Sequence, residues 1–568
     1  MSYYTPPGRV VGASPLFRQL AQDIGLVPVI NRSVRWDATQ CRWSPGERLL
    51  VMILDILTGK SPLYRVIERW TTMDVELLVG TGRDAAELTD DSLGRALDKL
   101  ARAQPARVFS AVAAQAYVRE GIPLGSGHWD STSCTLTGAY ADPPPEGTAC
   151  PQYGHSKDRR PDLKQLLLTL FVNREGVPLC GTVESGNRSD KTLNGEMIDR
   201  LIDAMDPKQL AQLIYVADSA LVTGPNLARL ARQQIAFVSR CPETFGATAQ
   251  VKQAAWAADD WTTLPALGSR RDAARYWASE QHAVIDDRPY RMVVYRSSAL
   301  DQRRARALDA KIRQDRTAME AAATALKAQR FTCEADAAAA WTAWQATWRQ
   351  GWCHATATIR AEVRQTRPGR PRKVPRPEDT ETRWWVDVEV GTVRKARRTA
   401  ELERRGTFVL ITTVPAERLS ALELLREYKA QTSVERHFHF VKDPLFVDGW
   451  FLKKAERLEA LGYVILLACL LYSLLERRLR ASGQAIPSPS RGVLTRPTGH
   501  EVVRHLESLQ VVRDPDGTRH IALDPLFHAT CTAILAAAGM EGTVFTTPPI
   551  DLNTDQEPSN RISVDTNI

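Results

Sequence analysis

The chain has 568 residues, of which 43% are hydrophobic and 25% charged, so it is long enough for several domains and too apolar to be disordered throughout. Lys and Arg outnumber Asp and Glu by 74 to 66, and this basic excess favours a polyanionic partner if the charge is clustered. The nine cysteines contain no C-x2-C pair, which argues against a structural zinc site and a disulfide scaffold and for a reducing compartment.

The first part of the chain has a helical pattern, which predicts an all-α N-terminal domain over residues 1–120. Leu49, Leu50, Ile53 and Ile56 recur at helical spacing, and Thr89 is expected to cap a helix that includes residues 93–100. No strand pattern interrupts residues 15–116, and no signal-peptide pattern precedes them.

Residues 121–242 change to the pattern of a mixed α/β sheet. Three runs rich in β-forming residues predict a meander, and a helix, a strand, a helix and a fifth strand follow. The expected elements are strands at 128–136, 164–172 and 178–185, a helix at 190–205, a strand at 213–217, a helix after Pro225 and a strand at 235–239.

Residues 243–405 are expected to form a large α/β insertion, after which the sheet domain resumes over 406–482. The insertion is predicted to contain strands at 275–285, 290–296, 355–363 and 384–390 and helices at 300–328 and 335–350. A strand at 407–414 and a long helix at 416–442 are expected next.

An apolar run at 461–475 has 15 residues, fewer than the roughly 20 that a bilayer span needs, and therefore predicts a buried core helix. Residues 483–568 are expected to be helical, with a disordered polar tail after Thr546. The sequence thus indicates a soluble, cytoplasmic protein.

Three carboxylates stand out as candidates for chemistry. Asp130 lies within the first predicted strand and Asp218 ends the fourth, where α/β sheets place active-site groups. Tyr428, Glu435 and Lys442 are spaced seven apart, so on one helix they would project within about 40° of each other, with Gln431 beside them. Taken singly, either Asp could be a helix cap or turn residue, and the helix residues could form a solvated stripe.

Together these carboxylates predict a metal site. Two Asp and one Glu offer hard oxygen ligands without imidazole or thiolate, which suits Mg²⁺ or Mn²⁺. Such a set can hold two ions, one to generate a hydroxide and one to stabilise the leaving oxygen of a phosphodiester. The basic excess of the chain points to the same class of substrate.

The order strand Asp, strand Asp, long insertion and helix Glu resembles the DDE transposases of bacterial insertion sequences, which have a ribonuclease-H-like core. The spacing of Tyr428, Gln431, Glu435 and Lys442 resembles the Y-x2-R-x3-E-x6-K signature of one group of them. The resemblance implies that Asp130, Asp218 and Glu435 are catalytic and hold two Mg²⁺ ions, for which Mn²⁺ can substitute.

The resemblance also implies how DNA is bound. Tyr428 and Lys442 would position the DNA backbone. Gln431 stands where the family has an Arg that is associated with phosphate contact, and Gln lacks both the positive charge and the paired N–H donors of a guanidinium. The helical N-terminus would bind terminal inverted repeats, and the enzyme would act as a homodimer that also takes target DNA, with excision through a hairpin.

The insertion offers further DNA-binding candidates. In the family such an insertion covers the active site and helps hold a flipped or hairpinned DNA end, a task for a stacking aromatic residue. Trp384 and Trp385, with Trp352 behind them, are the candidates, although a strand Trp is commonly a core residue. Residues 360–376 carry seven basic residues and one acid, and their centre resembles an AT-hook, with Arg367, Arg370, Arg372 and Lys373. A solvated flexible loop is the alternative.

The sequence therefore predicts a nucleoid-associated transposase that cleaves DNA at the element's ends and joins the 3′-hydroxyls to target DNA. Two alternatives stay open: a ribonuclease-H-like DNA nuclease without strand transfer, and a transposase-derived DNA-binding protein without catalysis. The intact carboxylate set argues against the second.

Overall fold

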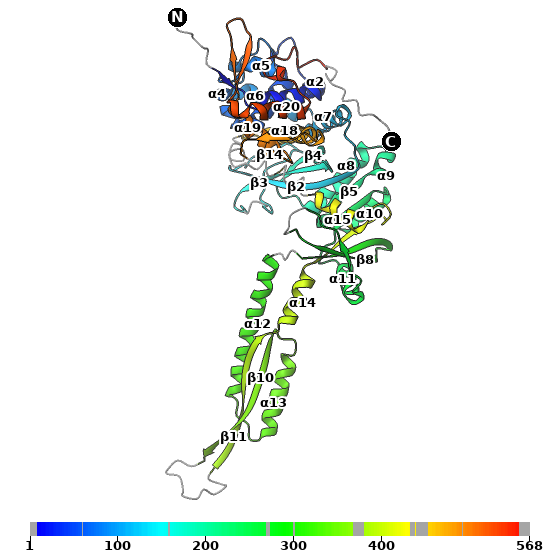
Figure 1. Cartoon of the computed structure of the whole chain (residues 1–568), viewed down its shortest axis with the longest axis vertical. Helices are drawn as coiled ribbons and strands as arrows, with labels where there is room; N and C mark the ends of the chain where they lie inside the picture. The colour runs from blue at the N-terminus through cyan, green and yellow to red at the C-terminus, as the bar shows by residue number, and fades with distance from the viewer. Residues whose placement is uncertain are drawn as a thin grey trace. The chain divides into compact units, whose positions relative to one another are not determined.

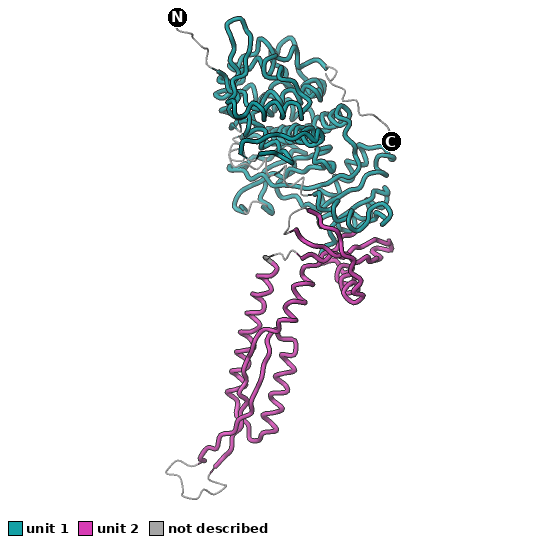
Figure 2. The backbone as a smooth tube through the Cα atoms, in the orientation of Figure 1, with its two compact units in different colours: residues 1–242, 412–568 teal, residues 243–411 magenta. Residues whose placement is uncertain are grey.

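The computed structural model describes residues 8–59, 61–156, 160–268, 273–298, 302–366, 380–431, 438, 452–490 and 492–555. The chain forms two compact units, which Figure 2 colours separately: unit 1 contains residues 1–242 and 412–568, and unit 2 contains residues 243–411. The finer division into domains made from the sequence stays a prediction.

Unit 1 contains a mixed sheet in which the strands lie in the order β4-β3-β2-β5-β6. The first three strands of the chain in this sheet form an antiparallel meander, whereas β5 is parallel to β2 and β6 is parallel to β5. This arrangement confirms the mixed α/β class that the sequence predicts. The strands are β2 (Ser126–Leu136), β3 (Lys164–Asn173), β4 (Pro178–Ser185), β5 (Ile214–Ala217) and β6 (Ala236–Arg240).

Helices precede this sheet, and their ends follow the capping residues in the sequence. Ser44 and Glu47 form a reciprocal capping box at α3, and the Thr89 hydroxyl accepts a hydrogen bond from Ser92 N at the start of α6. The helices are α1 (Ser14–Asp23), α2 (Leu26–Ser33), α3 (Pro45–Thr58), α4 (Val66–Trp70), α5 (Val75–Val79), α6 (Asp90–Arg102) and α7 (Pro105–Arg119).

The apolar run lies in α18 (Ala455–Ala481), which packs against α3, α6 and β4. In the described part of the chain α18 is the one helix whose length and composition would allow it to cross a membrane, but 94% of its most apolar stretch is buried inside the protein. It is therefore a core helix, as the length of the run predicts. Figure 1 shows α18 and α7 on the same side of β2, β3 and β4.

The two faces of the sheet are covered by different helices. Leu166, Leu168 and Leu170 of β3 belong to the same buried cluster as α18. On the opposite face Tyr215 of β5 donates a hydrogen bond to Asn194 Oδ1 of α8 (Asp190–Ala204), at 3.1 Å. Because Asp130 is paired with Leu170, it belongs to the α18 face. The remaining helices after the meander are α9 (Pro207–Gln212) and α10 (Gly224–Arg232).

The C-terminal part of unit 1 differs from the sequence-based expectation, because it contains strands as well as helices. The strand β1 (Arg9–Val10) pairs with β15 (Gln510–Arg513), so both ends of the chain share one small sheet. The other elements are β13 (Ile486–Ser488), β14 (Gly492–Leu494), α19 (Gly499–Leu506), β16 (Arg519–Ala522) and α20 (His528–Ala538).

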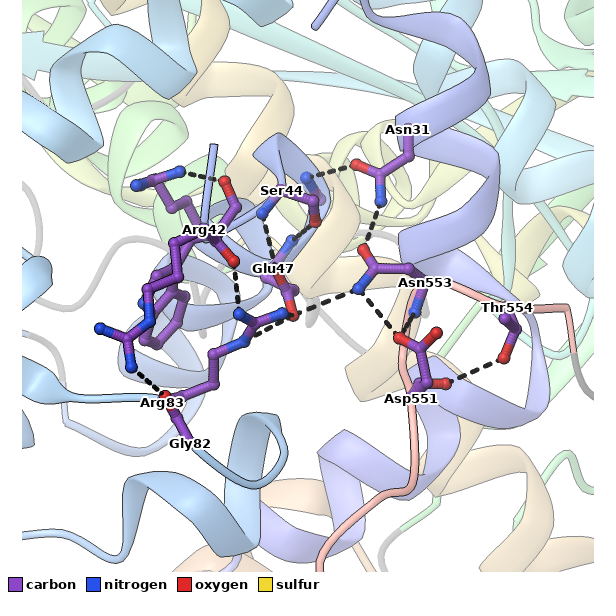
Figure 3. Close-up of polar contacts among 12 residues, drawn as sticks. Asn31, Arg42, Ser44, Glu47, Gly82, Arg83, Asp551, Asn553 and Thr554 are labelled. Carbon is purple, nitrogen blue, oxygen red and sulfur yellow. Dashed lines mark hydrogen bonds and ion pairs between the residues drawn. The ribbon is translucent and has the colours of Figure 1, made fainter. Parts of the chain in front are cut away.

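The expectation of disorder directly after Thr546 is wrong for residues 547–555. Asn553 accepts a hydrogen bond from Asn31 at 2.8 Å and donates one to Glu47 at 3.4 Å, as Figure 3 shows. Asp555 accepts from Arg32 at 2.9 Å and from Arg119 at 2.6 Å. The polar composition of this segment reflects side chains that bond to N-terminal helices.

Unit 2 contains the strands β12, β9, β8 and β7, which lie side by side in that order, and the antiparallel hairpin β10–β11. Trp344 and Met319 join Val386 in an apolar cluster between the hairpin and the helices α12 and α13. The elements are α11 (Gly246–Ala258), β7 (Thr262–Leu264), β8 (Tyr276–Ile285), β9 (Arg288–Ser297), α12 (Gln302–Ala328), α13 (Glu334–Thr347), β10 (Cys353–Gln365), β11 (Thr380–Val393), α14 (Lys395–Arg405) and β12 (Thr407–Thr412), whose last residue belongs to unit 1.

Candidate active site

The strand register bears on where two of the three predicted metal ligands lie. In the parallel pair β2–β5, Ser126 is opposite Ile214 and His128 is opposite Val216, a constant offset of 88 residues. Asp218 directly follows β5 with extended backbone (φ −70°, ψ −175°), and it is 88 residues after Asp130. The register extended by two residues would therefore place these aspartates opposite each other, about one strand spacing of 4.8 Å apart.

Backbone groups orient both carboxylates. Asp130 Oδ1 accepts a hydrogen bond from Ser131 N at 2.7 Å, and Asp218 Oδ1 accepts one from Ala220 N at 3.0 Å as the cap of a short 3-10 helix. The Asp218 carbonyl also accepts from Ser239 Oγ of β6, at 2.7 Å. Both aspartates are half-buried at the sheet. Such bonds hold a carboxylate in one orientation, as hydrogen bonds to metal ligands commonly do.

The third predicted ligand lies outside the described residues, as does Lys442. The helix expected over 416–442 begins later, because residues 415–419 form a turn and Ser420 caps α15 (Ala421–Ala430) in a capping box with Glu423. Gln431 is the C-terminal cap of α15, and the residues from 432 to 451 other than Phe438 are not described. The roles of Glu435 and Lys442 stay predictions.

The two described signature residues lie at the end of α15. Gln431 is 9% exposed, and its Nε2 donates to the carbonyl of Trp129 in β2 at 3.4 Å. Tyr428 is half-buried, and its carbonyl accepts from Gln431 N at 3.3 Å. The Gln431 side chain thus ties α15 to the strand that carries Asp130, next to that residue. Phosphate contact by Gln431 and Tyr428 stays a prediction.

A buried pair beside these residues was missed by the sequence reasoning. His128 Nε2 of β2 lies 3.0 Å from Glu427 Oε1 of α15, and the two side chains are 0% and 6% exposed. Burial alone would raise the pKa of Glu427, but His128 and Ser126, with Arg174 nearby, hold it below the usual value for a glutamate. The only signal in the sequence was a histidine two residues before a strand aspartate, on the same face.

The described donors fit a hard divalent cation, because two carboxylates from neighbouring strands offer oxygen ligands of the kind that Mg²⁺ and Mn²⁺ take. No group of three or more His, Cys, Asp or Glu side chains among the described residues could hold a metal ion. A third carboxylate ligand for Asp130 and Asp218 would therefore come from outside the described residues, where the predicted ligand Glu435 lies.

The DNA-binding candidates of the insertion lie in unit 2. Trp384 packs against the apolar cluster of α12 and α13, whereas Trp385 is the next residue of β11, with the Arg330 guanidinium 5.1 Å from its ring centre. Trp352 is 7% exposed under Arg397, which lies 4.4 Å from its ring centre. The AT-hook-like stretch, with Arg367, Arg370, Arg372 and Lys373, lies outside the described residues. All these DNA contacts stay predictions.

Comparison with known proteins identifies two family matches. A domain of unknown function (DUF4277) matches residues 10–114, and a transposase DDE domain matches residues 129–471. No curated protein matches the chain. A solved structure, the cryo-EM structure of a piggyBac transposase synaptic complex with hairpin DNA, is similar at 7% identity and a TM-score of 0.34, with 88% of this chain and 80% of that chain covered. A likeness this weak carries no argument.

The transposase match includes Asp130, Asp218 and the whole signature region from Tyr428 to Lys442. It extends over more than half of the 568 residues. The protein therefore belongs to the family of DDE transposases.

Proposed function

We propose that the protein is an insertion-sequence transposase with a ribonuclease-H-like core, in which Asp130, Asp218 and Glu435 form the catalytic site. The observation that carries the proposal is that Asp130 and Asp218, within a transposase DDE domain, have the same offset of 88 residues as the paired residues of β2 and β5. The mixed sheet with an antiparallel meander followed by two parallel strands supports a core of this kind.

The three carboxylates would hold two Mg²⁺ ions, which supply an activated water and stabilise the leaving oxygen of the phosphodiester. The chain's own residues orient the reaction. Tyr428 and Lys442 position the DNA backbone, and residues 1–120 bind the terminal inverted repeats in a homodimeric complex. The freed 3′-hydroxyl then attacks a phosphodiester of target DNA, so that the new bond replaces the bond to the target strand's own 3′-oxygen, which leaves; a hairpin is the excision intermediate.

The test compares the wild type with Asp130→Asn, Asp218→Asn and Glu435→Gln on DNA that contains the element's ends and Mg²⁺. Each substitution should lower the cleavage rate by at least about 100-fold, since loss of a mere outer-shell partner of a metal already costs 10–100-fold. Asp516→Asn is the matched control, because Asp516 is exposed and accepts from Thr518 N at 2.9 Å, as Asp218 does from Ala220 N. The control should cleave like the wild type.

The products separate the alternatives. Joined products with target DNA would support a transposase, and cleavage without joining would indicate a nuclease. Binding of the ends by all variants and the wild type, with no cleavage by any, would contradict the catalytic proposal and indicate a DNA-binding protein.

A further inference from the structure

The strand that carries Asp130 has a row of polar residues on one face. Ser126, His128 and Asp130 alternate along β2 and therefore lie on the same side of the sheet. Ser126 and His128 are buried, with 8% and 0% exposure, whereas Asp130 is half-buried. A strand on the face of an apolar core would normally carry apolar residues at these positions.

The buried part of this row is bound by one residue of α15. Glu427 Oε1 lies 3.0 Å from His128 Nε2, and its other oxygen lies 3.7 Å from Arg174 Nε. Ser126 also hydrogen-bonds to the Glu427 carboxylate. Glu427 directly precedes Tyr428 of the Y-x2-R-x3-E-x6-K-like motif. The contact therefore joins α15, which carries the start of this motif, to β2, which carries Asp130.

A second contact lies one helical turn further along the same face of α15. Gln431, four residues after Glu427, donates from Nε2 to the carbonyl of Trp129 at 3.4 Å. The two contacts therefore reach His128 and Trp129, the two residues of β2 that directly precede Asp130. Two fixed points on a helix determine both its distance from the strand and its rotation about its own axis.

Stability alone does not account for this arrangement. A buried pair of polar side chains costs free energy in desolvation, and apolar residues of similar volume often hold a core as well or better. His128 Nδ1 and Nε2 and Glu427 Oε1 are buried, and none of the three makes a hydrogen bond of regular geometry with the residues that the structure describes, so the 3.0 Å contact between Nε2 and Oε1 does not offset the cost of burial. Buried polar side chains at positions that a core normally fills with apolar residues are typical of functional sites, where the geometry of nearby groups matters.

We propose that His128 and Glu427 form a positioning pair that fixes α15 against β2. By fixing α15, the pair would position the predicted third metal ligand, Glu435, relative to Asp130. This inference rests on the proposed function, since Glu435 follows α15 in the sequence. The pair itself touches neither metal nor DNA; it acts through the two elements that it joins.

The key variant is the double substitution His128→Leu with Glu427→Leu, which replaces the directed contact with apolar packing. Its melting temperature and its affinity for end DNA should stay near those of the wild type. Mn²⁺ affinity, measured on the protein without DNA from the electron paramagnetic resonance signal of free Mn²⁺, should fall about tenfold, and cleavage should fall 10–100-fold, the usual effect of removing groups that orient metal ligands. Glu427→Gln keeps an oxygen next to His128, so it should retain more Mn²⁺ affinity and more cleavage activity than the double variant.

The control is Asp98→Asn, which breaks the ion pair that Arg457 of α18 makes with Asp98 of α6, at 2.7 and 2.8 Å. This variant should lose thermal stability and keep wild-type Mn²⁺ affinity, because its contact lies on other elements. Wild-type Mn²⁺ affinity in the double variant, or in His128→Leu alone if the double variant does not fold, would overturn the positioning role. Absence of Mn²⁺ binding and cleavage in the wild type would instead overturn the proposed function.

Discussion

Glu459, in the first turns of α18, is a partly buried acid close to other acids. Its Oε2 accepts a hydrogen bond from Ala149 N at 3.2 Å, which links the helix to the loop between β2 and β3. Burial, and to a lesser degree the charges of Glu184 and Glu456, raises the pKa of Glu459 to about 7, against the opposing effect of the Ala149 N–H.

The raised pKa predicts how stability depends on pH. An unfolded glutamate releases its proton near pH 4.3, whereas folded Glu459 keeps it up to about pH 7. Since the folded state binds more protons in this window, the free energy of unfolding should fall as pH rises from about 4 to 7 and level off above. Glu459→Gln, which cannot ionise, should therefore be more stable than the wild type by about 3 kcal/mol at pH 8, since partial exposure of Glu459 reduces the full effect of the shift, and equally stable at pH 4.

Urea unfolding at pH 4, 6 and 8 measures this difference. Glu507→Gln, at an exposed position after α19, is the control and should show no such trend. A stability gain of Glu459→Gln that is the same at all three pH values would contradict the assignment to ionisation.

At the scale of elements, the close approach of α18 to β4 depends on a residue without a side chain. A Cβ at Gly462 would lie 2.7 Å from Val183 Cγ2 and 3.1 Å from Val183 Cγ1. A valine side chain in a packed core cannot swing away, so the helix can lie this near the sheet only with glycine there. The Tyr463 hydroxyl, on the next residue, accepts from Val183 N at 3.3 Å, which only a close helix allows.

Gly462→Ala should therefore destabilise the protein by about 1–3 kcal/mol through overpacking, although alanine is the better helix former. Val183→Ala makes room for the added methyl group, so in that background the same substitution should cost at least about 0.5 kcal/mol less. Urea unfolding of the four proteins gives this coupling. An equal cost in both backgrounds would show that Val183 is not the obstacle.

At the scale of the molecule, the two ends of the chain stabilise each other within unit 1. Arg519 of β16 forms a buried ion pair with Asp74 at the start of α5, with bonds of 2.7 and 3.2 Å. Arg478, near the end of α18, forms ion pairs with Asp23 and Glu120. Asp23 is the last residue of α1, and Glu120 directly follows α7. The family domain at residues 10–114 is therefore packed together with the C-terminal residues in one core.

Removal of residues 547–555 should loosen this core. Glu47 is 1% exposed and would lose the hydrogen bond from Asn553 beside its partner Arg83, and the core would lose the buried side chain of Leu552. A chain ending at Thr546 should melt several degrees below a chain ending at Asp555, a comparison that isolates these nine residues. Differential scanning calorimetry of the two proteins measures the effect, and equal melting temperatures would show that the contacts in Figure 3 do not contribute to stability.

Local patterns were sufficient for most elements. The strands of the meander and the helix α8 lie within two residues of the expected bounds, because alternation and capping are properties of neighbouring residues. The start of α15 was misplaced by five residues, since Pro415 and the capping box at Ser420 compete with helical spacing. Residues 547–555 were misread because a polar segment has no apolar pattern even when its side chains bind another part of the chain.

The sequence by itself determined the class of the sheet, the core helix α18 and the spacing of carboxylates that resembles the transposase signature, since each depends on residues close in the chain or on a fixed motif. The tertiary structure decided what depends on distant residues. The register of β2 with β5, extended by two residues, would put Asp130 opposite Asp218, and the packing of α15 on β2 brings His128 against Glu427, almost 300 positions away. No local pattern encodes such pairs, because they form only when packing brings separate elements together.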